Sequence, residues 1–540
     1  MNRLPAALLG LALLASVTAC ATTDPTPVPA PSSAAPQVAT LGLDDMAYDL
    51  ADASGIAVHD FNLGNGTLTN GIGKPVPCPL TGIIAAPTTP GPHPVVMVIH
   101  GVTQINGIDD AVYAGFDYLI KQLAAEGYVA LAPNMNVEYS SDYGESNNSD
   151  WAYSIYQQHL AALARANDGV AMPYGVDLAG KLDLSQIHLM GHSRGGQVAD
   201  ALIRKDAALG TRRVRSLVLI ESTAPVSDDP HPDVPTGIIL GEYDGDVPEA
   251  GQSIFDAIRH ESGRTTPASL VFLRGANHAF FNRAFTNEDG PAAVDRLSRE
   301  QQERFLTHYA SAFLSVYAKG RTPFGIWDPS RPQPVSMFGY PVVASSVQPG
   351  HRTLLAVAAS ADPAPNADGG ASIAFVTQKR VASDLLFNHP GVALGDADLP
   401  LYRISWDGTS GSVSLPLTSK QLDGTQSISL FVAVDSSDSL NPFGQDQSFT
   451  LTLRDYAGGT RSVRVPIGTS ALSWHSGQTQ NIEGFDGSTT TVWSGTMPLG
   501  ELRVPLRLFA GVELHNIAGI DIALDQTERG AVMLSGISAI

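Results

Sequence analysis

The stretch that decides the fold is Ile187-His-Leu-Met-Gly191-His-Ser193-Arg-Gly195-Gly196. It begins as an apolar run, continues as a G-x-S-x-G motif and leads into the helix-compatible residues 197–205. A serine on a sharp turn between strand and helix projects its hydroxyl above the sheet, and small neighbours are needed because the turn is strained. Gly191 and Gly195 supply that space. The pattern therefore predicts Ser193 as a nucleophile.

The segment around this motif, residues 42–320, alternates short apolar runs with longer amphipathic ones. That alternation indicates an α/β domain with a mostly parallel sheet and helices on both faces. Helical spacing places the apolar residues of 116–124 and of 151–163 on buried stripes. The expected strands are Gly82–Ala86, Val95–Ile99, Val129–Ala132, Ile187–Met190, Val214–Ile220, Gly237–Leu240 and Ser269–Leu273.

Candidate partners for Ser193 follow the later strands. His278 lies in a loop after the last strand, and a neutral imidazole can accept the serine proton. Asp244 lies at the carboxyl end of a buried strand, where open α/β sheets place functional groups. Asp246 is an alternative acid, and Glu221, which ends the preceding strand, is a weaker third one. The order serine, acid, histidine suits a triad on this type of sheet.

An oxyanion site needs backbone N–H groups beside the nucleophile. Val102, after the strand 95–99, and Arg194, after the serine, are the candidates. His100 is expected to stabilise this loop through hydrogen bonds.

The substrate contacts are less specific. Gln104, His192, Tyr139 and Trp151 are candidates because they lie in the motif or in loops that follow strands. The loop 134–151 is equally compatible with a cleft wall and with a solvated loop.

Four motifs, His100-Gly101, Gly191-His-Ser193-Arg-Gly-Gly196, Gly241-Glu-Tyr-Asp244 and Gly275-Ala-Asn-His278, together resemble the α/β-hydrolase superfamily. The resemblance covers roughly residues 75–320, and within it the chain looks like the dienelactone hydrolase, chlorophyllase and polyester-hydrolase-like esterases. It implies cleavage of carboxylic esters through an acyl-enzyme, without metal or organic cofactor. Val102 and Arg194 depart from the residues that polyester hydrolases often carry there.

Composition sets wider limits. The chain has 540 residues, which is too long for one ordinary core and predicts two domains. Its formal net charge is −21, which argues against nucleic acid as a partner.

The first residues predict export. Arg3 precedes an apolar run, residues 4–17, that is too short to span a membrane. Residues 1–20 are therefore expected to be a signal peptide, of lipoprotein type if Cys20 is lipidated, which would be the protein's membrane attachment. Residues 21–41, rich in Pro, Thr, Ser and Ala, are expected to be a tether. Cys78 is then left without a disulfide partner, and we expect it to be buried.

The second half changes in texture. Residues 321–364 are expected to connect the domains, and 365–540 to form an all-β, jelly-roll-like sandwich, because short alternating runs are separated by Gly, Asp and Ser. This half resembles galactose-binding-like modules, which implies possible contact with a glycan or polymer. Core positions are preferred for Trp406, Trp474 and Trp493.

The leading hypothesis is an extracytoplasmic serine hydrolase that acts on esters. A surface-anchored binding or adhesion protein that uses the sandwich is the alternative from another class. Amide, thioester and acyl-transfer chemistry would use the same three residues.

Overall fold

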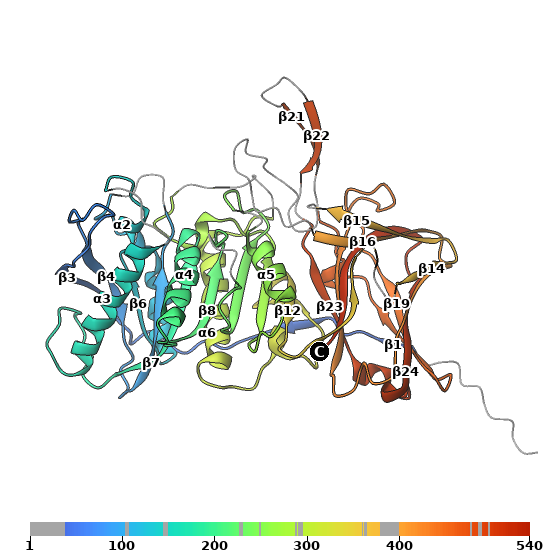
Figure 1. The fold of residues 1–540 in the computed structure, drawn as a ribbon, viewed down its shortest axis with the longest axis horizontal. Coiled ribbons are helices and arrows are strands. Elements are labelled where there is room, and N and C mark those ends of the chain that lie inside the picture. The colour runs from blue at the N-terminus through green and yellow to red at the C-terminus, as the bar shows by residue number, and fades with distance from the viewer. Residues whose placement is uncertain are drawn as a thin grey trace, which may run out of the picture. The chain divides into compact units, whose positions relative to one another are not determined.

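A computed structural model describes residues 38–102, 107–143, 149–225, 230–247, 250–286, 289, 295–358, 360, 364–378, 399–475, 478–483, 489–494 and 497–540. Residues 38–540 form one compact unit. Its first half alternates helices and strands, whereas the described residues beyond Trp327 contain only strands and short 3-10 helices (Figure 1). None of the described helices is long and apolar enough to cross a membrane.

The first half contains all of the described α-helices and the strands of one sheet. The helices are α1 (Asp117–Ala125), α2 (Asn136–Tyr139), α3 (Asp150–Asn167), α4 (Arg194–Ala208), α5 (Ala250–His260) and α6 (Arg299–Tyr317). The strands are β2 (Asp44–Met46), β3 (His59–Asn65), β4 (Pro79–Ala85), β5 (His93–Ile99), β6 (Val129–Pro133), β7 (Leu182–His192), β8 (Val214–Ile220), β9 (Thr236–Gly241), β10 (Ala268–Leu273), β11 (Pro334–Met337) and β12 (Tyr340–Val347). All seven expected strands are confirmed, each within a few residues.

The sheet has eleven strands in the order β2-β11-β12-β10-β9-β8-β7-β5-β6-β4-β3. The six central strands, from β6 to β10, are parallel, and antiparallel pairs begin on either side of them. Parallel strands end at the same edge of a sheet, so the loops after β5, β7, β8, β9 and β10 meet there. This edge carries the candidate site.

Helices cover both faces of the sheet, as predicted. Alternate residues of β5 point to opposite faces: Val95 and Met97 belong to the core under α3, α4 and α5, and Val96 belongs to the core under α1 and α6. The apolar stripes of α1 and α3 are buried in these cores. The strands therefore read as continuous apolar runs because both faces are covered.

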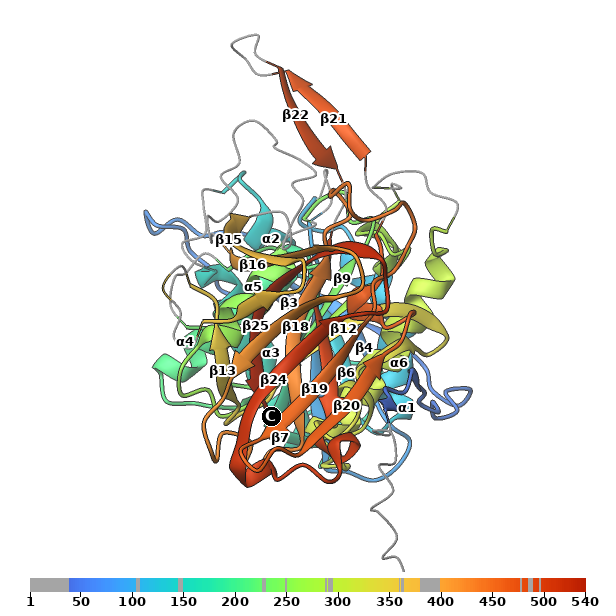
Figure 2. The same ribbon diagram turned by 90° about the vertical axis from the view of Figure 1, so that its right-hand side faces the viewer.

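The second half is built from two six-stranded sheets. One has the order β1-β20-β19-β24-β17-β14; the other has β15-β16-β25-β18-β23, with β13 beside β25. Figure 2 shows β24, β19 and β20 of the first sheet side by side. The strands are β1 (Ala39–Thr40), β13 (Arg352–Ala356), β14 (Asn366–Asp368), β15 (Ala371–Gln378), β16 (Leu399–Asp407), β17 (Gly411–Pro416), β18 (Ser427–Val434), β19 (Phe449–Asp455), β20 (Thr460–Val465), β23 (Gly500–Pro505), β24 (Ile517–Leu524) and β25 (Arg529–Ala539), with a separate hairpin of β21 (Gln478–Glu483) and β22 (Thr489–Ser494).

A common core joins the two sheets into a sandwich. Leu451 of one sheet and Leu430 of the other belong to the same apolar cluster. Trp406 and Trp474 are 1% and 8% exposed, which confirms the core positions expected for them. The side chain of Trp493 lies outside the described residues.

The junction between the halves involves more of the chain than composition suggested. The expected connecting segment, residues 321–364, contributes β11 and β12 to the first sheet, because β12 pairs with β10. At the end of the expected tether, Leu41 is buried in the sandwich core. Phe255 of α5 and Phe431 of β18 share an apolar cluster. The two halves are therefore packed through a continuous core.

Candidate active site

Ser193 occupies a strained turn between β7 and α4. Its φ is 56° and its ψ is −130°, a conformation that costs a non-glycine residue about 1–3 kcal/mol. A side chain at Gly195 would lie 2.3 Å from the Ile99 carbonyl oxygen, and one at Gly191 would lie 2.3 Å from the Gly195 oxygen. The need for small residues beside the serine is confirmed, because neighbouring backbone occupies that space.

The loop after β5 lies directly on Ser193. A methyl group at Gly101 would be 2.6 Å from Cβ of Ser193, so the absence of a side chain allows this approach. Val102 is the next residue along that loop. Arg194 is the first residue of α4, and a helix leaves its first N–H groups without intrahelical acceptors. Both candidate oxyanion donors thus come from backbone that adjoins Ser193.

His100 stabilises the same loop, as expected. Its Nδ1 lies 2.7 Å from the Gly101 oxygen, and its Nε2 accepts the Met135 N–H at 2.9 Å. Burial lowers the pKa of His100 to about 4, so the ring is neutral at physiological pH. Tyr139 donates its hydroxyl to the His100 carbonyl at 2.7 Å, and the Arg194 guanidinium lies 5.9 Å from the Tyr139 ring centre. Tyr139 therefore belongs to the wall beside the nucleophile.

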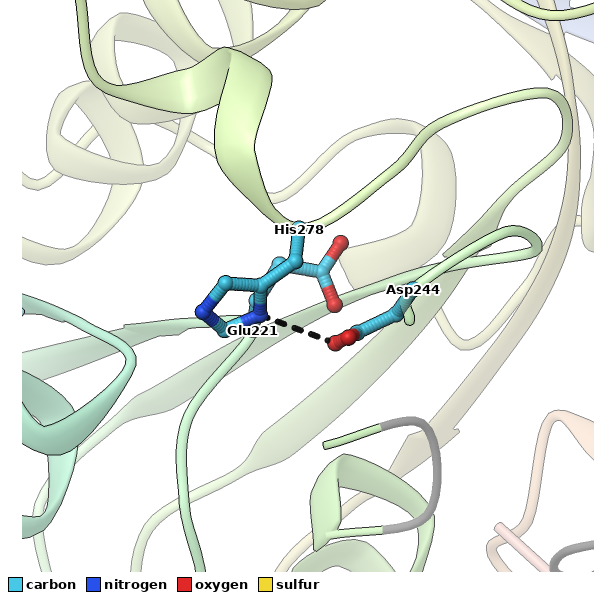
Figure 3. Close-up of side chains that lie close together, drawn as sticks. All are labelled: Glu221, Asp244 and His278. Carbon is cyan, nitrogen blue, oxygen red and sulfur yellow. Dashed lines mark hydrogen bonds and ion pairs between the residues drawn. The ribbon is translucent and has the colours of Figure 1, made fainter. Parts of the chain in front are cut away.

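His278 and Asp244 form a buried pair at the ends of β10 and β9. Nδ1 of His278 lies 3.2 Å from Oδ2 of Asp244, and the two residues are 3% and 2% exposed (Figure 3). The other oxygen of Asp244 accepts the N–H groups of Asp246 at 2.7 Å and Val247 at 2.9 Å. These bonds fix the carboxylate on the ring.

Asp246, the alternative acid, lies on the other side of the ring. Its carboxylate is 3.4 Å from Nε2 of His278 and its side chain is 64% exposed. Nε2 makes no hydrogen bond among the described residues. Geometry thus assigns the Nδ1 position to Asp244 and leaves Nε2 free to accept a proton.

Charge around His278 favours the imidazolium. Burial lowers the pKa of His278, but the charge and hydrogen bond of Asp244, followed by the charges of Asp246 and Asp289, raise it to about 8. Burial likewise opposes ionisation of Asp244, and the charge of His278 reverses this, so the pKa of Asp244 lies below its usual value. The pair is therefore stabilised as carboxylate and imidazolium.

Asp289 is a residue of this site that sequence reasoning missed. The loop after β9, which carries Asp244, is called the acid loop, and the loop after β10, which carries His278, is called the base loop. The Asp289 carboxylate accepts the backbone N–H of Gly245 in the acid loop at 3.0 Å. It also accepts the backbone N–H groups of His278 and Ala279 in the base loop at 2.9 Å each. It also accepts Nδ2 of Asn277 at 2.7 Å. Asp289 therefore holds the acid and base loops together. Its polar neighbourhood in the sequence resembles any surface turn, so no local signal marks it.

Glu242 makes a second link between the same loops and also contacts a residue of the β-sandwich. It accepts the Gly275 N–H at 2.9 Å, and its carboxylate lies 3.7 Å from Nδ1 of His475. His475 follows the core residue Trp474. The second half of the chain thus contacts the residue two positions before Asp244.

Glu221 ends β8 beside these groups. It is completely buried, and its φ of 44° is also positive. Figure 3 shows its carboxyl group near Asp244 and His278. One side-chain oxygen or nitrogen atom from each of these three residues lies within 4.8 Å of those of the other two. Among the described residues, this is the group of His, Cys, Asp or Glu side chains that could enclose a cation. An ion there would compete with the bond between His278 and Asp244.

The remaining candidates take other positions. His192 is fully buried, and its Nε2 lies 3.0 Å from the His278 carbonyl, so it supports the base loop from within. Trp151 is 5% exposed, donates Nε1 to the Thr69 carbonyl and lines a hollow of about 400 Å³ with residues 67–71. Gln104 and Cys20 lie outside the described residues. Cys78 is buried, as expected.

The comparisons with known proteins agree with this fold. The family model described as Chlorophyllase matches residues 59–231, from β3 to the loop after β8. The match includes Ser193 and Glu221 and ends before Asp244. No curated protein matches the chain. The parallel central strands, the helices on both faces and this match show that the first half of the chain has an α/β-hydrolase fold, and residues 59–231 are similar to the chlorophyllase family of serine esterases.

Proposed function

We propose that the protein is a serine hydrolase that cleaves carboxylic esters through an acyl-enzyme. The observation that carries this proposal is the buried contact of 3.2 Å between His278 and Asp244. The backbone of His278 also contacts the turn of Ser193, because the His278 carbonyl oxygen lies 3.0 Å from Nε2 of His192. Similarity of residues 59–231 to a family of esterases supports the same class of reaction.

The reaction begins at the Ser193 hydroxyl. Its oxygen attacks the ester carbonyl while Nε2 of His278 accepts its proton, and Asp244 stabilises the resulting imidazolium through Nδ1. The N–H groups of Val102 and Arg194 donate hydrogen bonds to the tetrahedral oxyanion, each worth a few kcal/mol in comparable enzymes.

Collapse of this intermediate breaks the bond to the alcohol, which takes the proton from His278. Water then attacks the acyl-serine, gives its proton to Nε2 of His278 and releases the carboxylic acid. As the bond between the acyl carbon and the Ser193 oxygen breaks, His278 returns that proton to Ser193. Every transfer uses groups of this chain and water.

The test replaces the nucleophile. We expect Ser193→Ala to lower hydrolysis of p-nitrophenyl butyrate by more than about 10⁴-fold and to abolish labelling by a fluorophosphonate probe. Ser185→Ala, at an exposed position of the same strand, is the matched control and should leave both unchanged. Full hydrolysis by Ser193→Ala would exclude the proposal.

We also propose that the protein works outside the cytoplasm, attached through a lipid on Cys20, and that the sandwich contacts a glycan or polymer. The signal-like residues 1–20 support the first part. Incorporation of labelled palmitate into the wild-type protein but not into Cys20→Ser is the expected result. Equal incorporation into both would exclude lipidation at Cys20.

A further inference from the structure

Glu221 is a buried ionisable group that the reaction above does not use. Glu221 is the residue that follows β8, and β8 pairs with β7, the strand that leads to Ser193. Neither carboxyl oxygen of Glu221 has a hydrogen-bond donor among the described residues. Oε1 lies against Gly241, where an added Cβ would be only 2.6 Å away. A carboxylate in this position would lose its hydration without receiving a compensating donor.

The groups that face Glu221 are mostly negative. Asp244 approaches from the loop after β9, and His278 approaches from the loop after β10. One carboxylate oxygen of Glu221, one of Asp244 and one ring nitrogen of His278 all lie within 4.8 Å of one another. Asp289 adds a further negative charge, and the Gly241 backbone N–H, which makes no hydrogen bond of normal geometry to Glu221, has an opposite effect on its pKa that is smaller than that of Asp244. Burial first, and then the charge of Asp244, raise the pKa of Glu221 well above its usual value.

Asp244 has room for another donor. A carboxylate offers about four lone-pair positions. One oxygen of Asp244 accepts two backbone N–H groups and the other meets His278. A protonated carboxyl group is the one form of Glu221 that can donate to it.

We propose that Glu221 is a neutral carboxylic acid at neutral pH that donates its proton in a hydrogen bond to the Asp244 carboxylate. Glu221 is then a positioning residue: it fixes Asp244 and favours its ionised form while His278 carries a proton. Its role in catalysis rests on the proposed function, whereas its protonation does not. An ionised Glu221 that orients His278 in place of Asp244 is the opposite arrangement.

Stability as a function of pH tests the protonation directly. A glutamate whose pKa is raised by folding stabilises the protein only at low pH, and that contribution is lost as the pH rises from the unfolded value, near 4.5, to the folded value. Glutamine has no proton to lose. The full-length Glu221→Gln protein should therefore gain stability over wild type as the pH rises above about 5, by roughly tenfold in the folding equilibrium per pH unit.

Glu242 provides a control, because its effect on stability is expected to change with pH in the opposite direction. Burial raises the pKa of Glu242, but His475, Arg274 and the Gly275 N–H together lower it below its usual value. Its contribution is present above the unfolded pKa and is lost as the pH falls through the folded one. Glu242→Gln should therefore be less stable than wild type at neutral pH, and the difference should shrink below about pH 4.5. If Glu221→Gln behaved like Glu242→Gln, or showed no dependence on pH, the proposal would be overturned.

Activity separates positioning from direct catalysis. Glu221→Gln retains a donor and should keep kcat within about tenfold of wild type, whereas Glu221→Leu should lower kcat about 100-fold with little change in KM. A loss in Glu221→Gln as large as that of Asp244→Asn would overturn the proposal, because it would make Glu221 the charged acid. Activity in Ser193→Ala would instead refute the proposed function, and the stability result would still decide the protonation.

Discussion

The carboxyl ends of β7 and β8 lie side by side and differ in how they hold an unusual residue. Ser193 and Glu221 both have positive φ, and both are buried at the same edge of the sheet. Gly191 and Gly195 flank the serine because backbone fills the space around it, whereas Leu219 and Thr223 occupy the same positions around the glutamate. The first turn exposes a nucleophile to the loop after β5, and the second aims a carboxyl group at the acid of the site. Backbone strain at a strand end therefore marks the site twice, and only one of the two turns has a sequence motif.

The largest expected effect on kcat is that of replacing Asp244, the acid of the site. Asp244→Asn should lower kcat by about 10⁴-fold, because an amide presents the wrong partner to Nδ1 of His278 and cannot stabilise the imidazolium. Steady-state kinetics with p-nitrophenyl butyrate, with circular dichroism as a check of folding, measures it. A loss of less than tenfold in a folded protein would mean that another group, Glu221 first, orients His278.

Asp289 tests whether the acid and base loops must be held together. Asp289→Ala removes an acceptor for three backbone N–H groups, so we expect kcat to fall about 100-fold and the pKa of His278 to drop. Asp295→Ala is a suitable control, because Asp295 is an exposed residue whose one hydrogen bond to the acid loop, among the described residues, is accepted from the Tyr243 hydroxyl. Equal kinetics for the two variants would argue against a positioning role for Asp289.

The two turns can also be compared through stability. Gly195→Ala places a methyl group against the Ile99 and His100 carbonyl oxygens and should cost about 1–3 kcal/mol of unfolding free energy. Thr223→Ala changes the corresponding position after Glu221, where the hydroxyl makes one long bond to Gln197, and should stay within about 0.5 kcal/mol. Chemical denaturation measures both. Similar costs would remove the contrast between the turns.

The smallest expected effect is on pH dependence. With the pKa of His278 at about 8, kcat/KM should rise with pH and reach half its maximum near pH 8, because only the neutral ring accepts the proton of Ser193. Asp246 favours the protonated ring, so Asp246→Asn should move this midpoint down by less than about one unit. Initial rates between pH 5 and 10 provide the measurement, and an upward shift would contradict the assigned charge effect.

The sequence by itself determined the architecture of the first half and the chemistry of its main turn. Apolar runs of strand length, amphipathic stretches between them and the glycines around Ser193 are local patterns, and each follows from burial or from backbone space. The all-β character of the second half was predicted for the same reason. His278 and Asp244 could be named because parallel strands bring their carboxyl ends to one edge.

Only the tertiary structure decided which carboxylates meet His278. Asp244 and Asp246 are two residues apart, and the turn after β9 directs them to opposite nitrogens of the ring. Asp289, Glu242 and His475 join the site through bonds to backbone N–H groups or through packing between distant segments, which leave no motif. Glu221 is close to Asp244 because β8 and β9 are neighbours in the sheet, and its protonation depends on burial and on charges brought from separate loops. Such effects depend on distance and dielectric environment, which are properties of the folded chain.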